Sequence, residues 1–220
     1  MATKMCFFTH DDKAFEEKII TFTYVKGMAF SQKQKNVISF HGSIQSAYPQ
    51  HRILEVSTKS LNPLGVKLSA FNLKLDGFPL ESVFQSSKVF ANGTQYTFLK
   101  SYAPRDAKKF ISENATMPLS SFRYNDAEFP LIPQSMFYDY IYIKALMAIP
   151  EISMALKDYD IFTDIEFNEK KQINCQARAC AIYAHMLRTN SVDFFMSSLS
   201  NFKTLYLPKE EKQLSFFDII

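Results

Sequence analysis

A carboxylate, an amide and an amine recur at helical spacing in the stretch LGVKLSAFNLKLDGFPLESVFQSSKVF, residues 64–90. Glu81, Gln85 and Lys88 stand at positions i, i+4 and i+7, which share one face of a helix. On a carbon at the aldehyde oxidation level, an amine can attack to form a Schiff base while a carboxylate moves protons. A surface Glu–Lys pair on an amphipathic helix has the same spacing and is the commoner explanation for it.

The elements that position these side chains are expected to be short and separated by turn residues. A turn at Asp76-Gly77 precedes the helix of Glu81, and Pro79 begins that helix because its fixed φ suits a first turn. Hydrophobic patterns predict strands at 19–25, 36–41, 52–57, 66–75 and 159–167. Helices are predicted from Pro104 to Phe110 and at 135–148, 151–157, 174–188 and 191–200, with a loop-rich stretch at 111–133.

Composition indicates a globular protein of one domain with a substantial core. The chain has 220 residues, of which 47% are apolar, and its net charge is only +3. Such a charge excludes a histone-like electrostatic surface, so any nucleic acid must be bound locally. Three cysteines without CxxC spacing and four scattered histidines predict no disulfide framework, metal or cofactor. No signal peptide or membrane span is recognisable, which predicts a cytoplasmic protein.

Three sequence blocks follow one another between residues 60 and 190. The first comprises Ser69-Ala70-Phe71, Asp76-Gly77 and the run ESVFQSSKVF from Glu81 to Phe90. The second is PRDAKK from Pro104, and the third is YDIFTD at 159–164 followed by NCQA at 174–177. In this order they resemble the signature of the NADAR (YbiA-like) superfamily, F-S-N-F, D-G, E-H-x-F-Q-A-x-K-F, then P-x-x-A-K and D-x-x-W-G … G-x-N-x-L-G.

Departures from that signature point to one branch of the superfamily. The usual tryptophan is Phe162, the usual histidine is Ser82, and the last glycine is Ala177. Phenylalanine can stack on a base or sugar but has no N–H to donate. The runs RILEVSTKS (52–60) and INCQARAC (173–180) are similar to the NADAR antitoxins paired with DarT-type toxins, which ADP-ribosylate DNA.

The resemblance implies an α+β fold, mostly helical with a small mixed sheet. We expect a NADAR-like domain over 1–205, with a strand-rich part at 1–60 and the family core at 60–190, and a tail at 206–220. It also implies an ADP-ribosyl glycohydrolase that removes ADP-ribose from guanine in DNA, with Lys88 forming the Schiff base and Glu81 as general acid and base. Two alternatives are an N-glycosidase acting on a small nucleotide-like metabolite and a module that binds ADP-ribose without cleaving it.

Further residues are candidates for contacting the substrate. The resemblance assigns this role to Ser69, Phe71, Gln85, Arg105, Asp160, Phe162 and Asn174. Asp160 could equally cap a turn and Asn174 the helix predicted to start at Cys175. Arg105 belongs to a basic cluster with Lys108 and Lys109, for which a phosphate contact competes with a solvated helix face. Asp164 is a weaker candidate, and tyrosines 138, 140 and 142 are expected in the core.

The C-terminus suggests a partner. Gln213-Leu214-Ser215-Phe216-Phe217 resembles the Q-L-S/D-L-F peptide with which bacterial proteins bind the DNA polymerase sliding clamp. Four of the five positions match, and Phe216 replaces the leucine. Such a peptide inserts apolar anchors into a groove while the glutamine sets the register. An apolar end that folds back on the domain is an equally good explanation.

Overall fold

A four-stranded mixed sheet organises the N-terminal part of the computed structural model, which describes residues 1–170 and 172–206. Strands β1 (Ala2–Phe8) and β2 (Glu16–Phe22) pair antiparallel. Strand β9 (Ile161–Thr163) lies between β1, to which it is antiparallel, and β3 (Ile53–Glu55), to which it is parallel. Strand β9 is therefore central, which explains why all three of its residues are buried.

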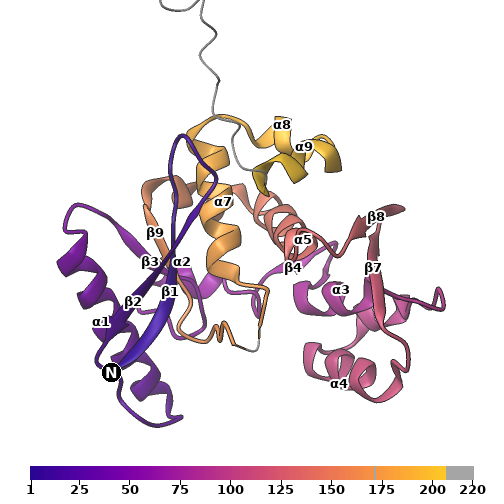
Figure 1. Cartoon of the computed structure of the whole chain (residues 1–220), viewed down its shortest axis with the longest axis horizontal. Helices are drawn as coiled ribbons and strands as arrows, with labels where there is room; N and C mark the ends of the chain where they lie inside the picture. The colour runs from indigo at the N-terminus through magenta and orange to yellow at the C-terminus, as the bar shows by residue number, and fades with distance from the viewer. Residues whose placement is uncertain (171, 207–220) are drawn as a thin grey trace, which may run out of the picture.

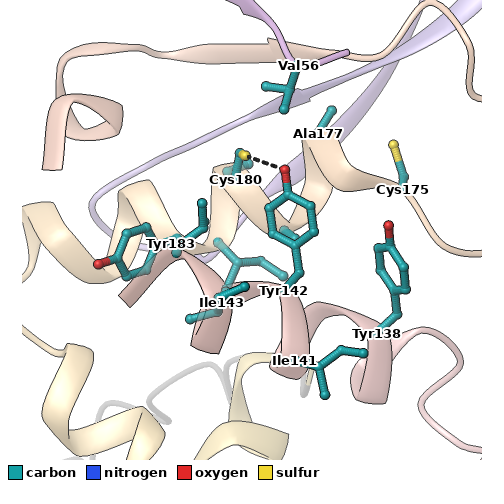
Figure 2. Packing of buried hydrophobic residues seen from close by; sticks show 14 of the residues in the cluster. Val56, Tyr138, Ile141, Tyr142, Ile143, Cys175, Ala177, Cys180 and Tyr183 are labelled. Atoms are coloured by element: carbon teal, nitrogen blue, oxygen red, sulfur yellow. Dashed lines mark hydrogen bonds between the residues drawn. The ribbon is translucent and has the colours of Figure 1, made fainter. Parts of the chain in front are cut away.

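Two helices cover the two faces of this sheet. Along β1, Cys6 and Phe8 point to the core beneath α1 (Phe30–Ala47), whereas Phe7 points to the core beneath α7 (Gln176–Arg188). This alternation is the period of two that a strand imposes on its side chains. Helix α7 packs in turn against α5 (Met136–Met147), where Cys180 Sγ lies 3.7 Å from Tyr142 Oη (Figure 2).

A second group of elements lies on the far side of α5 (Figure 1). It contains α3 (Leu80–Ser86), the 3₁₀ helix η1 (Thr97–Ser101), α4 (Pro104–Asn114) and an antiparallel sheet of β6 (Lys88–Phe90), β7 (Leu119–Tyr124) and β8 (Ala127–Pro130). Phe84, Phe122 and Phe137 stack between this sheet and α5. The shared aromatic core thus joins both groups of elements.

The remaining elements are short connections. They are α2 (Pro63–Lys67), β4 (Lys74–Leu75), β5 (Phe78–Pro79), α6 (Pro150–Ser153), η2 (Met154–Asp158), α8 (Val192–Met196), α9 (Leu199–Lys203) and η3 (Thr204–Tyr206). The α+β class with small mixed sheets is confirmed. Across the described ranges, no helix has the length and apolar character needed to cross a membrane.

Several predicted elements were wrong. Residues 36–41 belong to α1, because Val37, Phe40 and Ile44 recur at helical spacing and are buried while Ile38 is exposed. Residues 66–75 form the end of α2, turns and β4 instead of a strand. The strand predicted at 159–167 shrinks to β9, and the helix at 191–200 divides into α8 and α9. Strands β1, β7 and β8 were missed.

A close backbone approach explains why position 65 is glycine. A Cβ on Gly65 would overlap the carbonyl oxygen of Glu55 and lie 2.6 Å from Ser60 Oγ. We expect Gly65→Ala to lower the free energy of unfolding by about 1–3 kcal/mol, the usual cost of overpacking. Gly42→Ala is the matched control, since a Cβ there meets nothing within 4 Å and should stabilise α1. Urea denaturation of both variants would check this, and equal stability would contradict the packing argument.

Candidate functional site

Glu81 and Lys88 do not share one helix, which corrects the geometry predicted from their spacing. Helix α3 ends at Ser86, and Lys88 is the first residue of β6, paired with Phe122 of β7. The hydroxyls of Ser86 and Ser87 both donate to the carbonyl of Val83, at 2.9 and 2.8 Å, at this helix end. The two side chains nevertheless interact electrostatically, since the Glu81 carboxylate raises the pKa of the Lys88 amine.

Lys88 lies in surroundings that favour its neutral form. Burial lowers the pKa of its amine; the Glu81 carboxylate opposes this change, and the Lys108 ammonium adds to it. Its Nζ lies 5.3 Å from the centroid of the Phe84 ring. Within the part of the chain that the structure describes, Lys88 forms no salt bridge within 4.0 Å. An amine so placed is a better nucleophile at neutral pH than a solvated lysine.

Gln85 presents a buried polar atom without a partner. Its Nε2 donates to Glu81 Oε1 at 3.0 Å, which orients the carboxylate. Its Oε1 is buried and accepts no hydrogen bond from the described residues. A buried acceptor left unpaired costs free energy, so this oxygen is suited to accept a hydrogen bond from a bound ligand. The most suitable ligand group is a hydroxyl or amide N–H.

Packing of aromatic rings around Phe84 fixes the position of the helix that carries Glu81 and Gln85. The Phe84 ring packs against Phe122 at 5.4 Å, Phe137 at 6.1 Å and, edge to face, Tyr138 at 5.5 Å. Burial raises the pKa of the Tyr138 hydroxyl well above its usual range, and the carboxylates of Glu81 and Asp164 raise it further. Figure 2 shows this hydroxyl pointing toward Cys175, at the start of α7. Tyr138 is therefore a neutral hydroxyl on which several acidic groups act, Glu81 most strongly among them.

Asp164 and Gln176 join the end of β9 to the turn at 69–71. Asp164 Oδ1 accepts from the backbone N–H groups of Glu166 and Phe167, at 3.0 and 3.2 Å. Gln176 Nε2 donates to Asp164 Oδ2 at 2.9 Å, and Gln176 Oε1 accepts from the Ala70 N–H at 2.8 Å. These bonds hold the first family block against the third, although the two are about a hundred residues apart in the chain.

A second buried carboxylate lies beside Asp164. Glu55 Oε1 accepts from Ser57 Oγ at 2.6 Å and from the Ile165 N–H at 2.8 Å, and its Oε2 accepts from Thr163 Oγ1 at 2.6 Å. Burial raises the pKa of both carboxyls, and repulsion from Glu55 helps to bring the pKa of Asp164 to about 7. The two carboxyls therefore titrate as a coupled pair, and Asp164 is partly protonated at neutral pH.

The other predicted contact residues are dispersed. Asp160 lies at the opposite end of β9 from Asp164, where its carboxylate accepts from Arg188 and from the Arg52 N–H, each at 2.8 Å. Phe162 is completely buried inside the sheet, so the prediction that its ring stacks on a ligand is wrong for this conformation. Asn174 precedes the N-cap, which is Cys175, so the predicted helix cap is wrong as well.

Ser69, Phe71 and Arg105 have different degrees of exposure. Ser69 is buried and its Oγ accepts from the Phe71 N–H at 3.4 Å, whereas the Phe71 ring is 70% exposed. Arg105 is exposed in the first turn of α4. Gln213, Leu214, Phe216 and Phe217 lie outside the described residues, so the clamp-binding peptide stays a prediction.

Several side chains of this site were missed or underrated from sequence. Tyr138 was correctly assigned to the core, but the aromatic pattern of its helix carries no sign that carboxylates act on its hydroxyl. Glu55 gave a usable signal, because it stands between Leu54 and Val56 in an apolar strand where a lone carboxylate must be buried or exposed at an edge. Gln176 replaces the leucine of the family signature, and that departure was also readable.

Two cavities lie near the site without containing the pair. One, of about 380 Å³, lies between β1, α1 and the 165–170 segment. The other, of about 200 Å³, is lined by the face of α3 that carries Val83 and Ser87, opposite Glu81. No group of three or more His, Cys, Asp or Glu side chains within residues 1–170 and 172–206 is placed to hold a metal ion.

The carboxyl pair gives the stability of the protein a defined dependence on pH. The pKa of Asp164 is near 4 in an unfolded chain and about 7 in the fold, so the folded state binds more protons between these values. Its contribution to the free energy of unfolding is complete below about pH 4 and is lost as the pH rises through 7. Glu55→Gln removes the repulsion, so melting temperature should fall less steeply between pH 5 and 8.

Glu113→Gln, at an exposed site on α4, is the control and should leave the slope unchanged. Thermal denaturation of the three proteins at matched ionic strength would measure this. The same slope in Glu55→Gln and in the unmodified protein would show that the two carboxyls do not titrate as a coupled pair.

Comparison with known proteins identifies the family. No curated protein matches the chain significantly. The sequence model of the DarT1-associated NADAR antitoxin family matches residues 2–215, nearly the whole chain. The match confirms the resemblance carried by the three blocks and by the departures at positions 82, 162 and 177. The chain therefore belongs to the DarT1-associated NADAR antitoxins.

Proposed function

We propose that this antitoxin is a glycohydrolase that removes ADP-ribose from guanine in DNA through a Schiff base on Lys88. The observation that carries the proposal is the half-buried amine of Lys88, whose pKa is lowered chiefly by burial, beside the Glu81 carboxylate. Family membership supports the antitoxin role, because the partner toxins of this branch modify DNA. The unpaired Gln85 Oε1 supports a ligand at the same place.

The first half of the reaction replaces the base by the enzyme amine. Lys88 Nζ attacks the anomeric carbon of the ribose, and the bond from that carbon to the guanine nitrogen breaks. Glu81 takes a proton from the attacking nitrogen and gives it to the departing guanine nitrogen, so the base leaves unmodified. The bond from the anomeric carbon to the ring oxygen then breaks, the oxygen takes the remaining amine proton, and an imine results.

The second half releases the sugar. Water adds to the imine carbon while Glu81 moves one of its protons to the imine nitrogen; the carbon–nitrogen bond to Lys88 then breaks as Glu81 moves the remaining hydroxyl proton to the leaving amine, which leaves the aldehyde. The free aldehyde recloses to ADP-ribose. The sum of both halves is hydrolysis of one N-glycosidic bond. Gln85 holds Glu81 through its Nε2, and its free Oε1 is positioned to accept from a ribose hydroxyl.

The lysine is tested by substitution and by trapping. Lys88→Ala should abolish release of ADP-ribose from an ADP-ribosylated guanosine oligonucleotide, since no other amine takes the place of Nζ. Borohydride added during turnover should leave one ADP-ribose covalently attached to the unmodified protein, and none to Lys88→Ala, as read by intact-mass spectrometry. Lys157→Ala, at an exposed position of η2, is the control and should behave like the unmodified protein. Full turnover by Lys88→Ala would disprove the Schiff base.

The carboxylate is tested separately. Glu81→Gln keeps the shape of the side chain and an oxygen for Gln85 but cannot move protons. We expect turnover to fall by about a hundredfold or more, the loss typical of a general acid and base. Calorimetric affinity for free ADP-ribose should be nearly unchanged, whereas Glu113→Gln should alter neither quantity. If Glu81→Gln bound and released as before, proton transfer would have to be assigned to another group, with Tyr138 and Asp164 nearest.

A further inference from the structure

A basic and aromatic surface extends from the candidate site along η1 and the start of α4. We call it the η1–α4 surface; it comprises Phe98, Tyr102, Arg105, Lys108 and Lys109, with Lys100 at its edge, where its Nζ lies over the Phe78 ring beside the cavity of about 200 Å³. The rings of Phe98 and Tyr102 are 47% and 42% exposed, and the four cations are exposed as well. Isolated exposed rings are common on proteins, but two neighbouring rings among four cations are a specific combination.

This surface is attached directly to the helix of Glu81. Ser82 Oγ donates to the carbonyl of Tyr102 at 2.8 Å, so the surface begins one residue from Glu81 along α3. At its other end Lys108 is close enough to Lys88 to act on that amine electrostatically. Figure 1 shows α4 beside α3, and both η1 and α4 pack on α3. This surface is therefore within reach of a polymer attached to a substrate between Glu81 and Lys88.

The two rings are held as an exposed pair. Their centroids are 5.6 Å apart in an edge-to-face arrangement, and Phe98 rests on Phe110 at 5.3 Å. Phe98 is thus supported by Phe110 of α4 and in turn contacts Tyr102, while both rings keep a large exposed surface. Aromatic side chains presented in this way stack on unpaired bases, and each such contact contributes about 1–3 kcal/mol to binding.

The local charge suits a phosphate backbone. Between residues 97 and 109 four cations accompany a single acid, Asp106, although the whole chain has a net charge of only +3. Lys109 is partly neutralised by Glu113, 3.8 Å away at an exposed site, and such pairs are weak. Positive charge is therefore concentrated on this surface, whereas the positive and negative charges of the rest of the chain nearly cancel.

We propose that the η1–α4 surface binds the single-stranded DNA that flanks the modified base. Phe98 and Tyr102 would stack on neighbouring bases, and the cations would contact phosphates. A single strand is inferred because exposed rings stack on unpaired bases, whereas the bases of a duplex are already paired and stacked. The proposal rests on the proposed function only in naming the adduct that the flanking strand carries.

Binding of unmodified DNA tests the surface independently of catalysis. The probe is a fluorescent oligothymidylate of 12 nucleotides, titrated with protein at several salt concentrations. Lys100→Gln with Lys109→Gln should reduce the slope of log K against log salt by about 1.4 in magnitude, about 0.7 for each lost phosphate contact. Tyr102→Ala should weaken binding by about tenfold, within the range of one stacked base. Lys35→Gln with Lys157→Gln removes two exposed lysines elsewhere and should match the unmodified protein.

Kinetic measurements then distinguish two groups that the η1–α4 surface could bind: the DNA strand and the diphosphate of ADP-ribose. The variants should raise KM for an ADP-ribosylated oligonucleotide about tenfold or more and leave KM for ADP-ribosylated guanosine unchanged, with melting temperatures confirming that they are folded. Equal losses on both substrates would overturn the proposal in favour of diphosphate binding. It would also be overturned if the unmodified protein failed to bind the oligonucleotide or bound duplex as tightly. Absence of turnover on either substrate would refute the proposed function and leave the result of the oligothymidylate titration standing.

Discussion

Two carboxylates, Glu55 and Asp164, are buried together where the parallel strands β3 and β9 end. Neither could remain there unpaired, and the chain satisfies them with hydroxyls, backbone N–H groups and Gln176. Those bonds determine how the chain leaves β9, how α7 begins and where the 69–71 turn lies. The candidate site depends on this arrangement, because the carboxylates of Asp164 and Glu81 both act on the Tyr138 hydroxyl.

The helix end at Ser86 has a comparable consequence for Lys88. Had α3 continued by one more turn, the amine would have stood on a solvated helix face with the properties of an ordinary lysine. Placing Lys88 in β6 instead brings its stem over Phe84 and beside β7, where burial lowers the pKa of the amine. Spacing alone correctly paired Glu81 with Gln85 on one helix, but it wrongly placed Lys88 on that helix as well. It could not indicate why the amine is partly shielded from water, since that follows from the pairing of β6 with β7, more than thirty residues later in the chain.

The same limit explains the other failures of sequence reasoning. Helices that begin at Pro104 or near Ser135 carry local start signals, and they were predicted nearly correctly. Residues 36–41 contain apolar residues that fit either period over six positions, and only the longer register through Ile44 identifies a helix. Phe162 was predicted to contact ligand from its place in the family signature, but its burial depends on β1, β3 and β9 meeting, which no local pattern encodes.

Electrostatics connects the catalytic pair to the proposed DNA surface in two opposing ways. Lys108 helps to keep Lys88 neutral, but a phosphate bound at Lys108 would cancel that help and favour the ammonium form of Lys88. Burial is the larger cause of the lowered pKa, and a bound nucleotide would exclude more water from the amine. The proposed nucleophile can therefore keep its lowered pKa with DNA in place only because that pKa is lowered mainly by desolvation, and less by the cations that DNA would neutralise. If neighbouring cations alone lowered the pKa of a lysine, a polyanionic substrate would neutralise them and the lysine would be protonated again.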